Sequence, residues 1–186
     1  MNLPNRLTIL RIITVPFFVF FMLNNSIQAA PLIALILFAA ASITDYIDGN
    51  IARKQGLVTN FGKFLDPMAD KVLVISAMIC MLAKGLCSPV VVIIVVAREF
   101  LVSSLRLVAA SQNVVIAAGK SGKLKTASQM LSICAILTLC CIRSLGNVAI
   151  PVESISNWLM WITAAIAVYS GGEYLIQNRH FIDPKQ

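Results

Sequence analysis

The chain has 186 residues, of which 59% are hydrophobic and 12% are charged, and its mean hydropathy is +0.86. An average globular protein has about 45–50% apolar and about 25% charged residues, so this chain has too few polar residues to cover a surface that faces water. The composition excludes a soluble enzyme, a disordered chain and a disulfide scaffold, and it predicts an integral membrane protein.

The net charge of +7 would suggest nucleic acid as a partner of a soluble chain. In a membrane protein, the same excess indicates cytoplasmic loops and contacts with anionic membrane lipids, so we expect no nucleic acid. The five cysteines form no Cys-x-x-Cys pair and accompany a single histidine, His180. We interpret them as small apolar residues rather than a disulfide framework or a zinc site; they are Cys80, Cys87, Cys134, Cys140 and Cys141.

Six segments are long and apolar enough to cross a hydrocarbon core of about 30 Å. They are residues 7–23, 31–51, 66–83, 89–110, 124–142 and 155–177. The first could instead be a signal peptide, because Arg6 precedes its apolar run. However, no convincing Ala-x-Ala cleavage site follows, and Arg11 lies inside the run. We therefore expect this segment to be part of the mature protein.

The positive charges are distributed unequally between the two sets of loops. Residues 24–30, 84–88 and 143–154 hold only Lys84 and Arg143 as cations. The opposite side carries Arg6, Arg53, Lys54, Lys63, Lys120, Lys123, Lys125, Arg179 and Lys185. The positive-inside rule then places both termini in the cytoplasm, which agrees with an even number of spans. We expect an all-α polytopic fold of six transmembrane helices, forming one membrane domain over residues 1–186.

Four of the eight acids lie at the predicted cytoplasmic ends of the second and third spans: Asp45, Asp48, Asp66 and Asp70. An ionised carboxylate at membrane depth costs several kcal/mol unless it is paired, metal-bound or in contact with water. Spacings of three and four residues place each pair on one face of its helix. Because the connection, residues 53–65, is short, we expect the two spans to be antiparallel neighbours.

Carboxylate ligands without His or Cys favour Mg²⁺, Mn²⁺ or Ca²⁺ over zinc, and four negative charges would match two divalent cations. In the alternative, Asp45 and Asp66 cap helices or pair with Arg53 and Lys71, which accounts for one or two acids but not for four. Small residues surround the acids at 39–42, Gly49, Ala52, Gly62 and Ala69. They allow close helix packing or leave room for a head group, and both interpretations stay open.

The stretch from Asp45 to Asp70 matches D-x2-D-G-x2-A-R-x8-G-x3-D-x3-D at every fixed position. By this pattern the chain resembles the CDP-alcohol phosphatidyltransferase family, and eight fixed residues at fixed gaps make the match specific. Residues 3–11, 59–67, 98–106 and 122–126 resemble the bacterial branch of the family that makes phosphatidylglycerol phosphate.

The resemblance implies transfer of the phosphatidyl group from CDP-diacylglycerol to the hydroxyl of sn-glycerol 3-phosphate, with release of CMP. It also implies a bacterial inner membrane, an active site that faces the cytoplasm, and a homodimer. It implies two divalent cations, Mg²⁺ or Mn²⁺. The first would be held by Asp45, Asp48 and Asp66, and the second by Asp66 and Asp70. Asp70 would also act as general base. The residues expected to bind CDP-diacylglycerol are Asn5, Thr8, Asp48, Gly49, Ala52, Arg53 and Gly62.

The acceptor phosphate needs cations of its own, and Arg98 and Arg106 lie eight residues apart on one face of the fourth span. With Lys123 and Lys125 at the start of the fifth span, they are expected to form the glycerol 3-phosphate pocket. The alternative is that the arginines form salt bridges, but adjacent Glu99 is expected to point elsewhere. We interpret the aromatic residues of the last span as interfacial and packing residues; they are Trp158, Trp161, Tyr169 and Tyr174. Glu173 and His180 receive no role.

Two other hypotheses remain. The same chemistry could use another acceptor, such as phosphatidylglycerol, serine, inositol phosphate or an aminoalcohol, because the aspartate motif is common to all of these enzymes. A cation transporter would instead need acids near the membrane midplane and usually an internal repeat, and the sequence shows neither feature.

Overall fold

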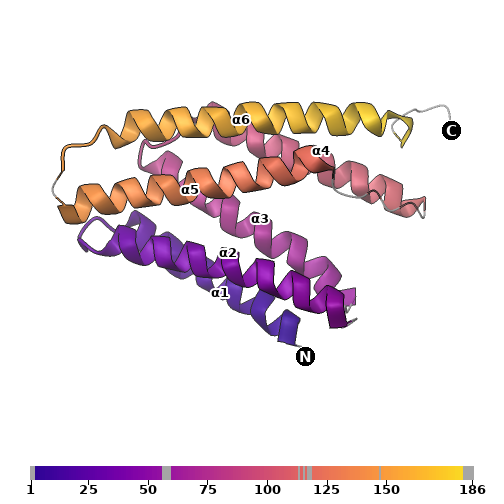
Figure 1. The fold of residues 1–186 in the computed structure, drawn as a ribbon, viewed down its shortest axis with the longest axis horizontal. Coiled ribbons are helices and arrows are strands. Elements are labelled where there is room, and N and C mark those ends of the chain that lie inside the picture. Colours follow the sequence, from indigo (N-terminus) through magenta and orange to yellow (C-terminus); the bar gives the residue numbers. More distant parts are fainter. Residues whose placement is uncertain are drawn as a thin grey trace. The chain divides into compact units, whose positions relative to one another are not determined.

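A computed structural model describes the backbone of residues 3–55, 60–112, 114, 116, 119–146 and 148–181. Within these ranges it describes all side chains except those of residues 3–7, 45–55, 60–68, 70 and 180. The secondary structure of this part is entirely helical, as expected (Figure 1). The helices are α1 Leu3–Leu23, α2 Ala30–Gln55, α3 Asn60–Ala83, α4 Pro89–Ser111, α5 Lys120–Gly146, α6 Val152–Gln177 and the short 3-10 helix η1 Arg179–Phe181.

Each predicted span corresponds to one helix, but four helices extend at least four residues beyond the apolar segment, and α1 already begins at Leu3. Helix α2 continues to Gln55, α3 already begins at Asn60, and α5 begins at Lys120. The expected connection over residues 53–65 was therefore too long, since only residues 56–59 separate α2 from α3. Hydropathy marks the apolar part of a helix, whereas backbone hydrogen bonding continues into polar sequence.

The chain divides into two compact units. The first unit contains Met1–Gly85 and Ile133–Val152, and the second contains Leu86–Ser132 and Glu153–Gln186. Helix α5 contributes its N-terminal half to the second unit and its C-terminal half to the first.

In the first unit, α1 packs along both α2 and α3, whereas α2 and α3 contact each other at fewer positions. The ring centroids of Phe18 on α1 and Phe38 on α2 are 5.9 Å apart, and both side chains are fully buried. Before α2, Gln28 exchanges two hydrogen bonds with Ser144 of α5, of 3.1 and 2.7 Å. Among the described residues α2 and α3 do contact each other, which agrees with the expectation that they are neighbours.

In the second unit, α4 has a well-defined start. The side chain of Ser88 accepts a hydrogen bond from the Val90 amide, and Pro89 occupies the first turn, where no donor is needed. On the other helices, the Thr163 hydroxyl of α6 donates to Ser132 of α5 at 2.9 Å. Such a contact satisfies polar groups inside an apolar helix pair.

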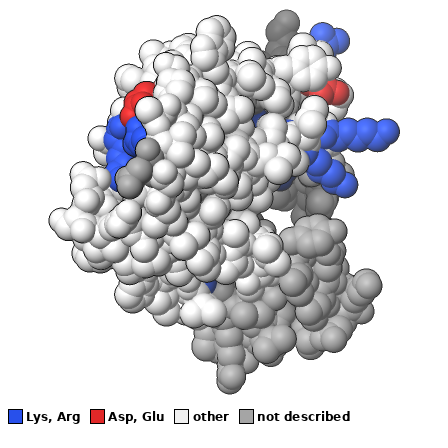
Figure 2. All heavy atoms as spheres, turned by 60° about the vertical axis from the view of Figure 1, so that its left-hand side comes forward, with Lys and Arg blue, Asp and Glu red and all other residues white. Residues whose placement is uncertain are grey.

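Large apolar side chains are exposed along all six α-helices, including Leu107 (73%), Trp158 (72%) and Ile176 (71%). Most of the described surface in Figure 2 is uncharged, and Lys and Arg occupy only small areas of it. Soluble monomers do not expose so much apolar surface, which indicates a membrane environment. Of the described residues, α5 and α6 are long and apolar enough to cross a membrane by length and composition. The six-span topology and its orientation stay predictions.

Candidate functional site

The four motif aspartates all lie on helical backbone. Asp45 and Asp48 belong to α2, and Asp66 and Asp70 belong to α3, each with helix on both sides. An N-cap residue precedes the first helical turn, so this position excludes capping as the role of Asp45 and Asp66. Their side chains lie outside the described residues, as do those of Asn5, Gly49, Ala52, Arg53 and Gly62. The described side chains themselves contain no group of three metal ligands.

Helix α1 contributes two buried polar residues to the first unit, which also contains the motif aspartates. Thr8, expected at the nucleotide, is 2% exposed, and Arg11 one turn later is 3% exposed. The Arg11 Nε donates to the carbonyl oxygen of Ala41 at 3.4 Å, one turn before Asp45 on α2. Sequence reasoning noted this arginine without giving it a role. The available signal was a cation inside an apolar run, which indicates a buried partner.

In the second unit, one carboxylate oxygen joins two cations. Glu99 Oε1 accepts from Arg98 Nη1 at 2.8 Å and from Lys125 Nζ at 2.6 Å. The expectation that Glu99 points away from Arg98 was wrong. Adjacent residues on a helix point in different directions, but the long side chain of Arg98 lets its guanidinium reach the carboxylate of Glu99. A partly buried carboxylate is costly without such partners.

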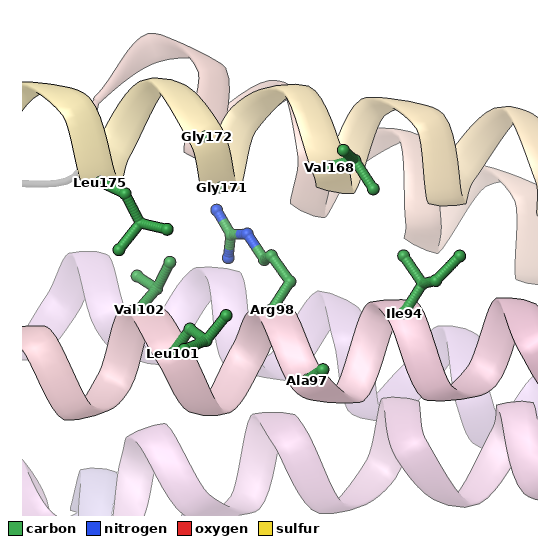
Figure 3. A pocket seen from close by; sticks show the side chains of 9 residues that line it. All are labelled: Ile94, Ala97, Arg98, Leu101, Val102, Val168, Gly171, Gly172 and Leu175. Atoms are coloured by element: carbon green, nitrogen blue, oxygen red, sulfur yellow. The ribbon is translucent and has the colours of Figure 1, made fainter.

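The stem of Arg98 crosses an apolar hollow of about 370 Å³ between α4 and α6 (Figure 3). Its Nη2 donates to Ser170 of α6 at 2.9 Å. Next to Ser170, a Cβ atom on Gly171 would lie 2.9 Å from Arg98 Cγ, closer than real Cβ contacts. A glycine is therefore required where the arginine approaches α6. The hollow is lined by Ile94, Ala97, Arg98, Leu101, Val102, Val168, Gly171, Gly172 and Leu175.

Arg106, two turns further along α4, also reaches α6. Its Nε donates to the Tyr174 hydroxyl at 3.1 Å, and its guanidinium carbon lies 5.4 Å from the centroid of the tyrosine ring. Because Ser170 and Tyr174 are one turn apart on α6, the two arginines lie on the same side of α4, as predicted. Lys123 is exposed on α5.

Among the described residues, Arg98 and Lys125 bind Glu99, and Arg106 binds Tyr174. Arg98 and Arg106 lie on the mostly apolar helix α4, where ionisable residues indicate a functional site. Among the remaining polar residues, Glu173 accepts from Gln177 on its own helix at 3.0 Å. Trp158, Trp161 and Tyr169 are exposed, and their interfacial position stays a prediction.

The family model for CDP-alcohol phosphatidyltransferases matches residues 1–169. The chain belongs to this family. A Bacillus subtilis protein named CDP-diacylglycerol–glycerol-3-phosphate 3-phosphatidyltransferase is 41% identical, with 95% of each chain covered. Proteins of the same name from Rickettsia typhi (40% identical, 93% of this chain and 94% of theirs) and Haemophilus influenzae (35%, 94% and 91%) are also similar. The chain is thus a phosphatidyltransferase, which favours this hypothesis over the cation transporter.

Members of this family generally depend on divalent metal ions. The motif supplies only carboxylate oxygens, which are the donors that Mg²⁺ and Mn²⁺ prefer. The helical backbone of α2 and α3 also supports the predicted spacing of three and four residues on one face. The donor set therefore fits divalent cations.

Proposed function

We propose that this protein transfers the phosphatidyl group from CDP-diacylglycerol to sn-glycerol 3-phosphate, giving phosphatidylglycerol phosphate and CMP. The names of its relatives support both substrates. The observation that carries the choice of acceptor is the acceptor cluster, the three cations Arg98, Lys125 and Arg106 on α4 and α5, of which both arginines reach α6. A doubly charged phosphate suits such cations, whereas serine or an uncharged alcohol brings no phosphate to them.

For the donor, we propose that Asp45, Asp48 and Asp66 hold one divalent cation and that Asp66 and Asp70 hold a second. When bound, such ions supply Lewis-acid stabilisation of the charge that develops on the pyrophosphate. Arg53 can bind two phosphate oxygens at once, and Gly49 leaves its backbone open for the cytidine. The complete donor set of the proposal is Asn5, Thr8, Asp48, Gly49, Ala52, Arg53 and Gly62.

The proposed reaction is a direct displacement. The acceptor hydroxyl oxygen bonds to the phosphorus that carries diacylglycerol, while the bond from that phosphorus to the CMP oxygen breaks. CMP leaves with the electron pair, and the Asp70 carboxylate accepts the proton of the attacking hydroxyl. A covalent intermediate is not needed, because the motif offers no Cys, Ser or His as an obvious nucleophile.

For the acceptor, the contacts divide the four predicted cations into two pairs. Arg98 and Lys125 already bind Glu99. We propose that they keep this contact and add positive charge to the pocket without binding the phosphate directly. Arg106 and Lys123 are exposed, and we propose that they contact the phosphate directly. An arginine is well suited to this because its planar fork binds two oxygens.

We further propose one membrane domain over residues 1–186 with six transmembrane helices. Both termini and the active site would face the cytoplasm of a bacterial inner membrane, and the protein would act as a homodimer among membrane lipids. The distribution of Lys and Arg between alternate loops supports this orientation.

The purified protein should be assayed for CMP release from CDP-diacylglycerol with a panel of acceptors. We expect glycerol 3-phosphate to be used far better than serine, inositol phosphate or phosphatidylglycerol. Preference for any of these would overturn the proposed acceptor, and ion flux without CMP release would support the transporter.

Two variants test the acceptor site within that assay. Arg106→Ala and Lys123→Ala should each raise the KM for glycerol 3-phosphate much more than the KM for CDP-diacylglycerol, because each removes a phosphate contact. Lys120→Ala is the matched control, since Lys120 is also exposed at the start of α5. Equal changes in both KM values, or none, would contradict the assignment.

A further inference from the structure

Tyr174 differs from the other tyrosine on α6 that the structure describes. Tyr174 is 7% exposed and forms a small apolar core with Val102 and Leu105 of α4, whereas Tyr169 is 68% exposed. The Asn178 side chain also donates to the Tyr174 carbonyl oxygen at 2.8 Å. The ring is therefore held firmly by packing, although its hydroxyl reaches an exposed arginine.

That arginine is Arg106, and the tyrosine holds it in two ways. The hydroxyl accepts from Nε at 3.1 Å, and the ring lies 5.4 Å from the guanidinium carbon, within the range of a cation–π contact. An exposed arginine without such contacts samples many rotamers and extends its charged end toward water. Here a buried partner restrains the inner nitrogen and holds the guanidinium near the tyrosine ring.

The way Arg106 is held leaves its binding groups available. Only Nε is used by Tyr174, and the two terminal nitrogens have no partner among the described residues. These nitrogens form the fork that binds a phosphate through two oxygens. In contrast, Arg98 already uses both of its terminal nitrogens, on Glu99 and Ser170.

We propose that Tyr174 is a positioning residue that orients Arg106 for the phosphate of the acceptor. This role rests on the proposed function, in which Arg106 contacts glycerol 3-phosphate. A guanidinium that is already oriented loses less freedom when the phosphate binds, so the effect of Tyr174 falls on acceptor binding. The chemical step and the binding of CDP-diacylglycerol do not depend on it.

The test is Tyr174→Phe, which removes the hydroxyl and keeps the ring. We expect the KM for glycerol 3-phosphate to rise about three- to tenfold, as for the loss of one hydrogen bond. The kcat, the KM for CDP-diacylglycerol and the melting temperature in detergent should stay unchanged. Tyr169→Phe removes an exposed hydroxyl five residues earlier and should change none of these values. In an Arg106→Ala background, Tyr174→Phe should have no further effect.

Three results would overturn the role of Tyr174. If Arg106→Ala raises the KM for glycerol 3-phosphate but Tyr174→Phe does not, positioning fails while the acceptor assignment stands. If Arg106→Ala has no effect either, the acceptor assignment fails and the role of Tyr174 fails with it. If Tyr174→Phe lowers the melting temperature and raises both KM values, or acts equally without Arg106, the tyrosine is only a packing residue.

Discussion

Two adjacent glycines of α6 allow the approach of Arg98 to be tested with matched substitutions. A Cβ on Gly171 would meet Arg98 Cγ at 2.9 Å, whereas a Cβ on Gly172 would meet nothing within 4 Å. Both positions lie inside the same helix, so Gly→Ala should give each the same gain in helix propensity, about 1 kcal/mol. Any difference between the two variants therefore reports the contact with Arg98.

The contact at Gly171 cannot be relieved easily. The near end of the Arg98 side chain is what clashes, and its far end is bound to Glu99 at 2.8 Å and to Ser170 at 2.9 Å. Overpacking of this kind costs about 1–3 kcal/mol. We therefore expect Gly171→Ala to be about 2 kcal/mol less stable than Gly172→Ala, which corresponds to about 4–8 °C in melting temperature for a chain of this size.

Thermal unfolding of both variants in the same detergent measures this difference. The clash should disappear in an Arg98→Ala background, where Gly171→Ala and Gly172→Ala should melt together. If the two single variants have equal melting temperatures with Arg98 present, the close approach of Arg98 to α6 is wrong.

Three further predictions concern the aspartates and one cysteine. Excess chelator and Asp66→Asn should each abolish nearly all activity, and full turnover in chelator would contradict the two-metal site. Asp70→Asn should keep CDP-diacylglycerol binding while kcat falls about 10²–10⁴-fold, whereas Asp45→Asn should weaken binding; equal loss of binding would make Asp70 chiefly a ligand. Burial raises the pKa of the Cys87 thiol, before α4, to about 11, so maleimide should label it far more slowly at pH 8 than the exposed position in Ala83→Cys. Equal labelling rates would show that Cys87 is accessible.

Hydropathy predicted the number and order of the helices well because each apolar run must be buried or face lipid. Hydropathy could not predict that α2 continues through the motif to Gln55 or that α3 already begins at Asn60. The polar residues in these stretches are compatible with either helix or loop. The family, in contrast, was predictable from the motif, because eight fixed residues in one register leave little room for coincidence.

The contacts of the acceptor cluster were less predictable. Spacing placed Arg98 and Arg106 on one face, and both do reach α6. Spacing also suggested that adjacent Glu99 faces away, but side-chain length prevailed over helix periodicity. The Tyr174 contact joins residues 68 positions apart, and nothing local to either residue indicates it. Partners at such a distance follow from packing between helices, which a single sequence does not contain.

The bridging carboxylate of Glu99 has a consequence for the biosynthesis of the protein. Helix α4 is made before the residues that satisfy its charges, since Lys125, Ser170 and Tyr174 all come later in the chain. An isolated helix that carries Arg98, Glu99 and Arg106 enters lipid poorly. With α4 as one of the six predicted spans, we expect the nascent α4 to leave the insertion machinery together with α5 and α6 rather than alone.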